Sequence, residues 1–488
     1  MKNKLQERSA LFFQFVFLMG SLCATVASLV VCGIAALHDG NVSMTVTAVY
    51  ALLFFGASLL FYRWFTTKCY GLFLSLVLCF VLRLVFVFVM KLEPFSDFRL
   101  YHGMASAIAN GQPLFSQYGA VFPHTVGFSW VISLVYRLFG EHPIFIQLFN
   151  VLAETLTAYL LYLSCNELFG NRVGILTSFL YGISPAFIFY SELSATEIPF
   201  TLLLSLLLYL IILYTKKQKM RYAVLFGVLA AVGNAIRPMG FLLLLVFGLY
   251  SICFLSGKRR FFAVSATIIC YLIVWESLWH GISFVNGQEI AKAPVGYNLY
   301  IGSNYEYSGK WNPTDYAHAN ELIYRENLPP DVFHQTLQRE AVLRYQKNGI
   351  RKNLELFLQK FSVLWGSEML PCDYLNRSGE FARVDAVFHT KNVANGFHWF
   401  LLLSVLMGSV PKRKSYNTGV FFIVLFVLGL TAQHLIAEVQ ERYSYPALAL
   451  LMCVAAYGIT RCYEKGAKLF VQATSGRYQS GDGERPCR

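Results

Sequence analysis

Charged side chains are scarce in this sequence, and a few of them stand beside apolar segments where they could do chemistry. The acids are Asp97 in SDFRLYHGMASAIANG, followed by Glu192 and Glu197 in SPAFIFYSELSATEIPF. The bases are Arg237 in NAIRPMG and Arg442 in EVQERYSYPALALL. A carboxylate can take a proton from an attacking hydroxyl group, and an arginine can bind phosphate through charge-assisted hydrogen bonds. Such groups near a bilayer are costly and tend to be functional.

Each acid also has a purely structural interpretation. Asp97 precedes a short apolar helix predicted over 101–109, and aspartate is a preferred N-cap residue. Glu192 and Glu197 lie at a turn between apolar segments, where they could orient an acceptor, hold a metal ion or cap the next helix. Position alone leaves these alternatives open.

The arginines also have two interpretations. Arg442 could pair with Glu438 or Glu441, or it could bind a phosphate group. Arg237 stands between two apolar segments, directly before a helix-breaking proline, and the same choice applies to it.

The composition predicts a membrane protein. Of the 488 residues, 56% are hydrophobic and 14% are charged, whereas a soluble domain is roughly 25% charged. This composition excludes an ordinary soluble enzyme. The 40 Lys and Arg against 27 Asp and Glu give a net charge of +13, which we interpret from its position in the chain and not as a sign of nucleic-acid binding.

Apolar runs long enough to cross a hydrocarbon core as helices recur along the chain. We expect about twelve transmembrane helices in an all-α polytopic membrane protein. The predicted runs are 11–37, 43–62, 69–91, 144–167, 172–190, 197–214, 222–236, 239–256, 261–279, 397–410, 419–437 and 445–461.

Basic clusters orient these helices, because Lys and Arg are enriched on the cytoplasmic side. Beyond the N-terminal MKNKLQER, the clusters lie at 63–68, 216–221, 258–260, 412–414 and 461–468. All of them face the cytoplasm only if the apolar segment 124–139 does not cross the membrane. We therefore predict that this segment is an amphipathic helix in the outer interface and that both chain termini are cytoplasmic.

This topology divides the chain into five parts. The predicted parts are two extra N-terminal helices over 1–68, a catalytic transmembrane core over 69–279 with a first outer loop over 92–143, an outer-face region over 280–396, C-terminal helices over 397–461 and a cytoplasmic tail over 462–488. Asp97, Glu192 and Arg442 all fall on the outer side. The cysteines show no paired spacing of the metal-binding type.

The ordered set of motifs resembles the GT-C superfamily of membrane glycosyltransferases, which includes protein O-mannosyltransferases, aminoarabinose transferases and the mannosyltransferases of glycolipid anchors. SDFRLYHGMASAIANGQPLF looks like the first-loop motif, and SPAFIFYSELSATEIPF looks like the second-loop motif of the glycolipid-anchor enzymes. GYNLYIGSNYEYSGKWNP and EVQERYSYPALALL resemble an outer stretch and the closing helix. Many relatives carry a second acid directly after the first, whereas Phe98 follows Asp97 here.

The resemblance implies transfer of a sugar from a polyprenyl-phosphate donor to a hydroxyl group of a glycan, lipid or protein acceptor, with inversion, at the outer face of a bacterial plasma membrane. It implies catalytic roles for Asp97, as general base, and for Glu192. The residues that would bind the donor phosphate are Arg237, Arg442 and Tyr443. The further substrate-binding candidates are Tyr101, His102, His124, Glu197 and Glu441. A divalent metal could take part, but no cofactor is implied with certainty.

Two other functions fit a many-helix protein with outer arginines. A transporter or flippase of lipid-linked sugars would need polar groups deep in the membrane or paired repeats. The sequence has few charges in the middle of its apolar runs, and Arg83, Glu154 and Glu276 are the exceptions. A polysaccharide polymerase would use an arginine-centred site without the early aspartate.

Overall fold

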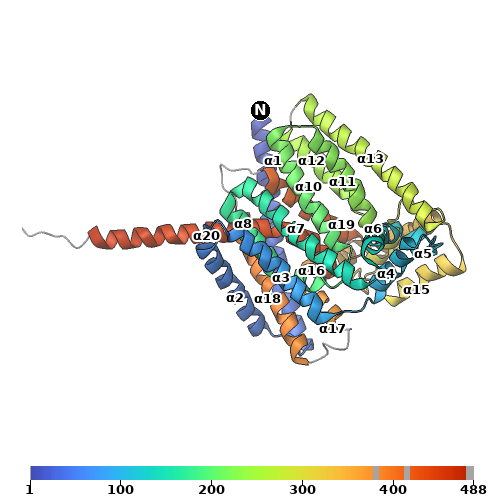
Figure 1. Ribbon diagram of the computed structural model, residues 1–488, viewed down its shortest axis with the longest axis horizontal. Helices are drawn as coiled ribbons and strands as arrows, with labels where there is room; N and C mark the ends of the chain where they lie inside the picture. Colours follow the sequence, from blue (N-terminus) through green and yellow to red (C-terminus); the bar gives the residue numbers. More distant parts are fainter. Residues whose placement is uncertain (1, 256, 377–383, 411–417, 480–488) are drawn as a thin grey trace, which may run out of the picture.

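The protein is a bundle of long α-helices. The computed structural model describes residues 2–255, 257–376, 384–410 and 418–479, and within these ranges the regular structure is helical, with no strand. Most long helices run along one diagonal of Figure 1, and α4, α5, α6 and α15 gather at its right-hand end. This architecture confirms the predicted all-α class.

Within the part of the chain that the structure describes, eight helices are long and apolar enough to cross a membrane. They are α1 (Lys2–His38), α2 (Met44–Trp64), α3 (Gly71–Met90), α7 (Pro143–Phe169), α10 (Glu197–Lys217), α13 (Lys258–Asn286), α19 (Thr418–Ile436) and α20 (Tyr445–Gln479).

The remaining four predicted crossings fall on shorter or more polar helices. They correspond to α8 (Asn171–Ile183) with α9 (Pro185–Tyr190), to α11 (Arg221–Ile236), to α12 (Gly240–Phe254) and to α18 (Val384–Ser409). Pro185 cannot supply a backbone N–H to the helix, so it separates α8 from α9. The count of twelve therefore stays a prediction.

Basic links gather at one end of the bundle. Arg172, after α7, donates to Thr66 Oγ1 at 3.3 Å and lies over the Tyr62 ring at 4.4 Å, which joins the α7–α8 and α2–α3 links. Lys216, at the end of α10, pairs with Glu167 at 2.6 Å. The basic cluster 412–414 lies outside the described residues.

The segment predicted not to cross the membrane forms α6 (Pro123–Phe139), which packs against α4 (Ser96–Ala109), α11 and α13. It is not among the candidate spans found in the described residues. Gly127 allows α6 to approach α11 closely, because a Cβ there would lie 2.2 Å from the carbonyl oxygen of Ala235. Short α5 (Gln117–Val121) precedes it.

The long region after α13 is helical and folds over the same end of the bundle as α6. It contains α14 (Gly296–Gly302), α15 (Pro313–Asn320), one π-helical turn (Glu321–Arg325), α16 (Pro330–Trp365) and α17 (Leu370–Asn376). Helix α16 bends at Gly349, where φ is +69°.

Within this region, a partly buried ion pair joins α15 to α16. Asp315 on α15 accepts hydrogen bonds from Arg344 at 2.8 and 3.1 Å. Asn304 and Asn312 donate to the same carboxylate at 2.8 and 2.9 Å. The Arg344 guanidinium also stacks on the Tyr300 ring at 3.7 Å, so α14, α15 and α16 form one unit.

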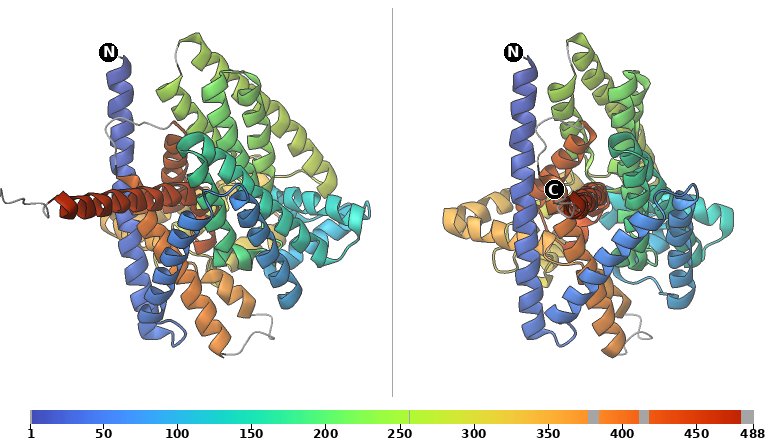
Figure 2. Two further views of the ribbon diagram at one scale, coloured as in Figure 1. Left: turned by 60° about the vertical axis from the view of Figure 1, so that its left-hand side comes forward. Right: turned by 90° about the vertical axis from the view of Figure 1, so that its left-hand side faces the viewer.

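The two N-terminal helices are built into the bundle. Lys391 on α18 pairs with Asp39 at 2.8 Å and with Asp373 at 2.9 Å. Asn392 accepts hydrogen bonds from the Ser43 amide and the Thr47 hydroxyl at 2.8 and 2.9 Å. In the left-hand view of Figure 2, α1 stands along one side of the other helices. The N-terminal helices therefore contact α18 directly and α17 through Lys391.

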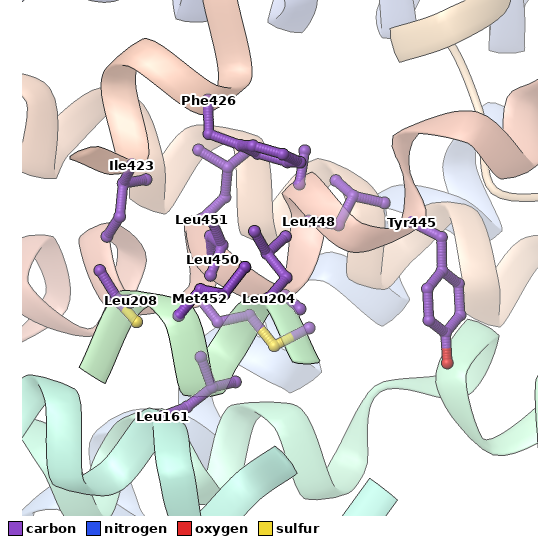
Figure 3. Packing of buried hydrophobic residues seen from close by; sticks show 14 of the residues in the cluster. Leu161, Leu204, Leu208, Ile423, Phe426, Tyr445, Leu448, Leu450, Leu451 and Met452 are labelled. Carbon is purple, nitrogen blue, oxygen red and sulfur yellow. The ribbon is translucent and has the colours of Figure 1, made fainter. Parts of the chain in front are cut away.

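The N-terminal half of α20 lies at the centre of the core. Its side chains Leu448, Leu450, Leu451 and Met452 interdigitate with those of α7, α10 and α19, as Figure 3 shows. Beyond the core the same helix projects away from the bundle, as Figure 1 and the left-hand view of Figure 2 show. The burial of these apolar side chains fixes the position of the residues that precede α20.

A second buried ion pair joins four helices within the apolar runs. Arg83 donates to Glu154 at 3.0 Å and to the backbone oxygens of Tyr181 and Gly182 at 3.1 and 3.0 Å. Tyr445 donates to the other carboxylate oxygen of Glu154. Both charged side chains are fully buried, and both have hydrogen-bond partners within the protein. The pair therefore gives no sign of a conducting path through the membrane.

Removing only the arginine should therefore be costly. We expect Arg83→Met to destabilise the protein by about 3–5 kcal/mol, because it leaves Glu154 buried without a counter-charge. The double variant Arg83→Met/Glu154→Gln should recover most of that loss, since the amide still accepts from Tyr445. Thermal unfolding in detergent measures both, and equal destabilisation of the single and double variants would contradict this account.

Candidate functional site

Asp97 lies in the first turn of α4, at the end of the bundle opposite the basic links. The N-cap residue of α4 is Phe95, and no side chain caps that helix end. The Asp97 side chain is 43% exposed and lies 3.5 Å from Arg442 Nη2. The structure therefore does not support the capping interpretation and leaves this carboxylate open to a ligand.

Arg442 lies in a short 3₁₀ turn, Glu441–Ser444, directly before the buried part of α20. Its guanidinium stands between two carboxylates, 3.5 Å from Asp97 Oδ2 and 3.8 Å from Glu197 Oε1. Its Nε–H is buried and has no hydrogen-bond partner among the described residues. The guanidinium is thus nearly enclosed but loosely held, and it retains capacity to donate.

Glu197 is the counter-ion that the two arginines share. It is the first residue of α10, and its side chain is 2% exposed. Arg237, at the end of α11, lies 2.9 Å from Glu197 Oε1 and donates to Thr196 Oγ1 at 3.3 Å. Because one buried carboxylate contacts both guanidinium groups, α10, α11 and α20 meet at this point.

Tyr443 forms an aromatic wall beside the arginines. Its ring stacks on His434 with a centroid distance of 4.8 Å. The guanidinium carbons of Arg237 and Arg442 lie 5.1 and 5.8 Å from the ring centroid. Contacts with the π face favour a cation at this distance, so Tyr443 orients the arginines.

Two further predicted residues face this cluster. Tyr101 lies one turn after Asp97 and packs edge-on against Phe128, and burial raises the pKa of its hydroxyl group, with Asp97 adding to the effect. The Nδ1 atom of His124 on α6 is buried without a partner among the described residues. Burial and then Arg237 and Arg442 lower the pKa of His124 to about 4, so its imidazole is neutral at neutral pH.

His102 and Glu441 have structural partners instead. His102 Nδ1 lies 2.7 Å from the Tyr136 hydroxyl group and ties α4 to α6. Glu441 accepts from the backbone amides of Met369 and Leu370, both at 3.1 Å. The structure therefore places these two predicted substrate contacts in roles that hold backbone segments.

Glu192 lies apart from the arginines, against the link before α4. Its Oε2 accepts from Gln147 Nε2 at 2.6 Å and from the Leu92 amide at 3.3 Å. This link contains left-handed residues, Lys91 at φ +48° and Ser96 at φ +47°, so it needs such support. Glu192 anchors the segment that carries Asp97, whereas Glu197 contacts the arginines.

Lys360 and Glu438 are buried charged groups that the site prediction omitted. Lys360 on α16 donates to the Gly302 carbonyl at 2.9 Å, and burial lowers its pKa to about 7. Burial raises the pKa of Glu438, whose carboxylate accepts from Gln440 at 2.7 Å. The sequence did contain a signal for the burial of Lys360, because it lies four residues after Leu356 and four before Leu364, on the apolar face of the helix.

The acids at this end do not form a metal-binding set. Asp97 and Glu197 each lie against a guanidinium group. No cluster of three His, Cys, Asp or Glu residues suited to a metal ion occurs in the described part of the chain.

Part of the chain matches a known family. Residues 123–279 match the model of the family described as dolichyl-phosphate-mannose-protein mannosyltransferase. This match confirms the resemblance to the GT-C superfamily. The matched segment runs from α6 to α13 and contains Glu192, Glu197 and Arg237, whereas Asp97 and Arg442 lie outside it.

Individual relatives are more distant. A protein of Aquifex aeolicus without a characterised function is 33% identical over 91 residues, which is 18% of each chain. The oligosaccharyltransferase AglB of Archaeoglobus fulgidus, solved with an inhibitory peptide and a dolichol-phosphate, superposes with a TM-score of 0.46 at 12% identity, over 86% of this chain and 53% of that one. ArnT of Cupriavidus metallidurans, bound to undecaprenyl phosphate, gives 0.38 at 12% identity, over 80% and 77%. The chain thus spans about half the length of the archaeal enzyme.

The burial of Glu192 predicts how the stability of the protein depends on pH. Burial raises the pKa of its carboxyl group from 4.5 to about 7. A buried carboxyl with a raised pKa destabilises the fold when it ionises, so the cost is absent below about pH 4.5 and complete above about pH 7. Glu192→Gln should therefore match the wild-type Tm at about pH 4.5 and exceed it at about pH 8.

Thermal unfolding of the purified protein across this pH range checks the prediction. The exposed control Glu289→Gln should follow the wild type throughout. A Tm difference between Glu192→Gln and the wild type that does not change with pH would contradict the prediction.

Proposed function

We propose that this GT-C relative is an integral-membrane glycosyltransferase. It moves a sugar from a polyprenyl-phosphate donor to a hydroxyl group of a glycan, lipid or protein acceptor. The observation that carries the proposal is the pair of buried arginines, Arg237 and Arg442, with the accessible carboxylate of Asp97 beside them. The family match over 123–279 supports the reaction class.

The donor phosphate would bind at the arginines. Both guanidinium groups lie beside Glu197, and Arg442 keeps a buried N–H without a partner. A phosphate oxygen is a stronger partner for a guanidinium than a carboxylate 3.5–3.8 Å away. The arginines would stabilise the negative charge that develops on the departing phosphate.

Asp97 would act as the general base. It takes the proton of the acceptor hydroxyl group as that oxygen attacks the anomeric carbon of the donor sugar. The bond from that carbon to the phosphate oxygen breaks, and the polyprenyl phosphate leaves with the electron pair. A single displacement inverts the anomeric configuration.

Orientation follows from the charge distribution. The basic links lie at the end away from Asp97, and Lys and Arg are enriched on the cytoplasmic side. We propose that the site opens on the outer face of the plasma membrane and that both termini are cytoplasmic. Undecaprenyl phosphate, which is bound in the C. metallidurans structure, is a practical first donor lipid.

Asp97→Asn should abolish most of the transfer, because the amide keeps the size of the side chain but cannot accept a proton. We expect kcat to fall by about 10²–10⁴-fold, with little change in donor affinity. An in-vitro transfer assay with correctly folded protein measures both. Asp331→Asn is the matched control, and near-normal turnover of Asp97→Asn would exclude Asp97 as the base.

Loss of either buried arginine should weaken binding of the lipid phosphate. We expect Arg442→Gln and Arg237→Gln each to raise the Kd for undecaprenyl phosphate by about tenfold or more, since each loses a charge-assisted hydrogen bond. Native mass spectrometry or a competition assay measures Kd. Arg325→Gln, in an exposed i,i+4 pair with Glu321, is the control, and unchanged affinity in both buried-site variants would contradict the assignment.

A further inference from the structure

A small pocket opens between the link before α4 and the turn after α9. Its lining includes Phe95 and Phe98 together with Gln147, Glu192 and Ser194. Phe98 directly follows Asp97 in the chain, so the pocket borders the segment that carries the proposed base. It does not include the arginines.

One buried acceptor atom in the lining of this pocket lacks a hydrogen-bond partner. Glu192 is 3% exposed, and its Oε1 has no hydrogen-bond partner among the described residues. Its Oε2 already accepts from Gln147 and the Leu92 amide. A buried acceptor left unpaired costs free energy comparable to a lost hydrogen bond, so a ligand donor that reaches Oε1 is favoured there.

We propose that this pocket binds a hydroxyl or hydroxymethyl group of a neutral sugar that belongs to the acceptor. This assignment rests on the proposed glycosyltransferase function. The hydroxyl group donates to Glu192 Oε1, while Gln147 holds Oε2 in place. The partly exposed ring of Phe95 packs against C–H groups of the sugar, and the buried ring of Phe98 supports Phe95 from behind.

The position of the pocket favours the acceptor over the donor. The proposed donor phosphate lies with Arg237 and Arg442, and Glu192 contacts neither arginine. The pocket and Asp97 share one short link, because Phe95 and Phe98 line the pocket and flank Asp97. A sugar held here therefore presents its remaining hydroxyl groups along the link towards Asp97.

The chemistry of the pocket favours a neutral group. Six of the ten lining residues are Phe, Pro or Leu, which give little solvation to a full charge. The second carboxylate of the lining, Glu93, is exposed to solvent. A hydroxyl group both donates and accepts, so it can pair with Glu192 whether or not that carboxyl is ionised. An ammonium group can only donate.

Binding can be measured without any turnover. The probes are methyl α-mannopyranoside, methyl β-glucopyranoside and methyl β-galactopyranoside, with glucosamine as the charged comparison. Saturation-transfer difference NMR on the full-length protein in nanodiscs reports which probe contacts it. Ser194→Leu fills the pocket, Glu192→Gln keeps the anchor on Leu92 but removes the charge, and Ser277→Leu on the exposed side of α13 is the matched control.

We expect at least one neutral glycoside to bind the wild type and Ser277→Leu. Ser194→Leu should lose that binding, and Glu192→Gln should weaken it by up to about tenfold, because a neutral hydrogen bond replaces a charge-assisted one. In the transfer assay, Ser194→Leu should raise the acceptor KM and leave the Kd for undecaprenyl phosphate unchanged.

The outcomes separate this inference from the proposed function. Glycoside binding that Ser194→Leu abolishes, in a protein that consumes no donor, supports the sugar subsite and rejects the glycosyltransferase. Donor consumption with no glycoside bound, or with equal binding by Ser194→Leu, overturns the subsite. Binding of glucosamine alone also overturns it, because the pocket would then select a cation.

Discussion

Glu197 connects three helices of this protein, because the guanidinium groups of two arginines lie against its single buried carboxylate. Arg237 comes from the end of α11 and Arg442 from the turn before α20, while Glu197 begins α10. Removing charges from water is expensive, and such a cluster persists only where the surrounding helices hold its geometry. The apolar packing of α20 supplies that support on one side (Figure 3), and Tyr443 supplies it on another. The cluster is close to electrically balanced without a ligand, yet one donor of Arg442 remains unused, which suits a site that must bind and release an anion.

The link before α4 depends on a second set of contacts. Its left-handed residues are held by Glu192 and Gln147 from one side, and Tyr374 on α17 packs against Phe95 and Phe98 from the other. The turn at α17 is tied to the N-terminal helices through Lys391. The two N-terminal helices thus contribute to the position of Asp97 through Lys391 and α17, although none of their side chains lies in the arginine cluster.

The sequence was sufficient to predict the class of fold and which end of the bundle carries the acids, because hydropathy and charge bias act locally along the chain. It also identified Asp97, Arg237 and Arg442, which the structure brings together with Glu197. It placed Glu192 in the catalytic set and Glu197 among the substrate contacts, whereas in the structure Glu197 is the acid that contacts the arginines. Five residues separate the two acids, and only the tertiary contact of α10 with α11 and the turn before α20 decides which one meets the arginines. The sequence did not identify Lys360 for the same reason, because the burial of its side chain under α14 depends on the long-range fold of the outer region. The number of membrane crossings also depends on tertiary structure, because Pro185 divides one apolar run into two short helices.

The central claim is that donor sugar is consumed at the arginine cluster. The most direct test incubates purified protein in proteoliposomes with a panel of radiolabelled undecaprenyl-phosphate sugars and a mixed acceptor fraction, and follows both chemical conversion and movement of the lipid across the bilayer. The account predicts release of free undecaprenyl phosphate in step with a new glycoside, and loss of both in Asp97→Asn. Movement of an intact donor across the bilayer without conversion would contradict it and would indicate a transporter.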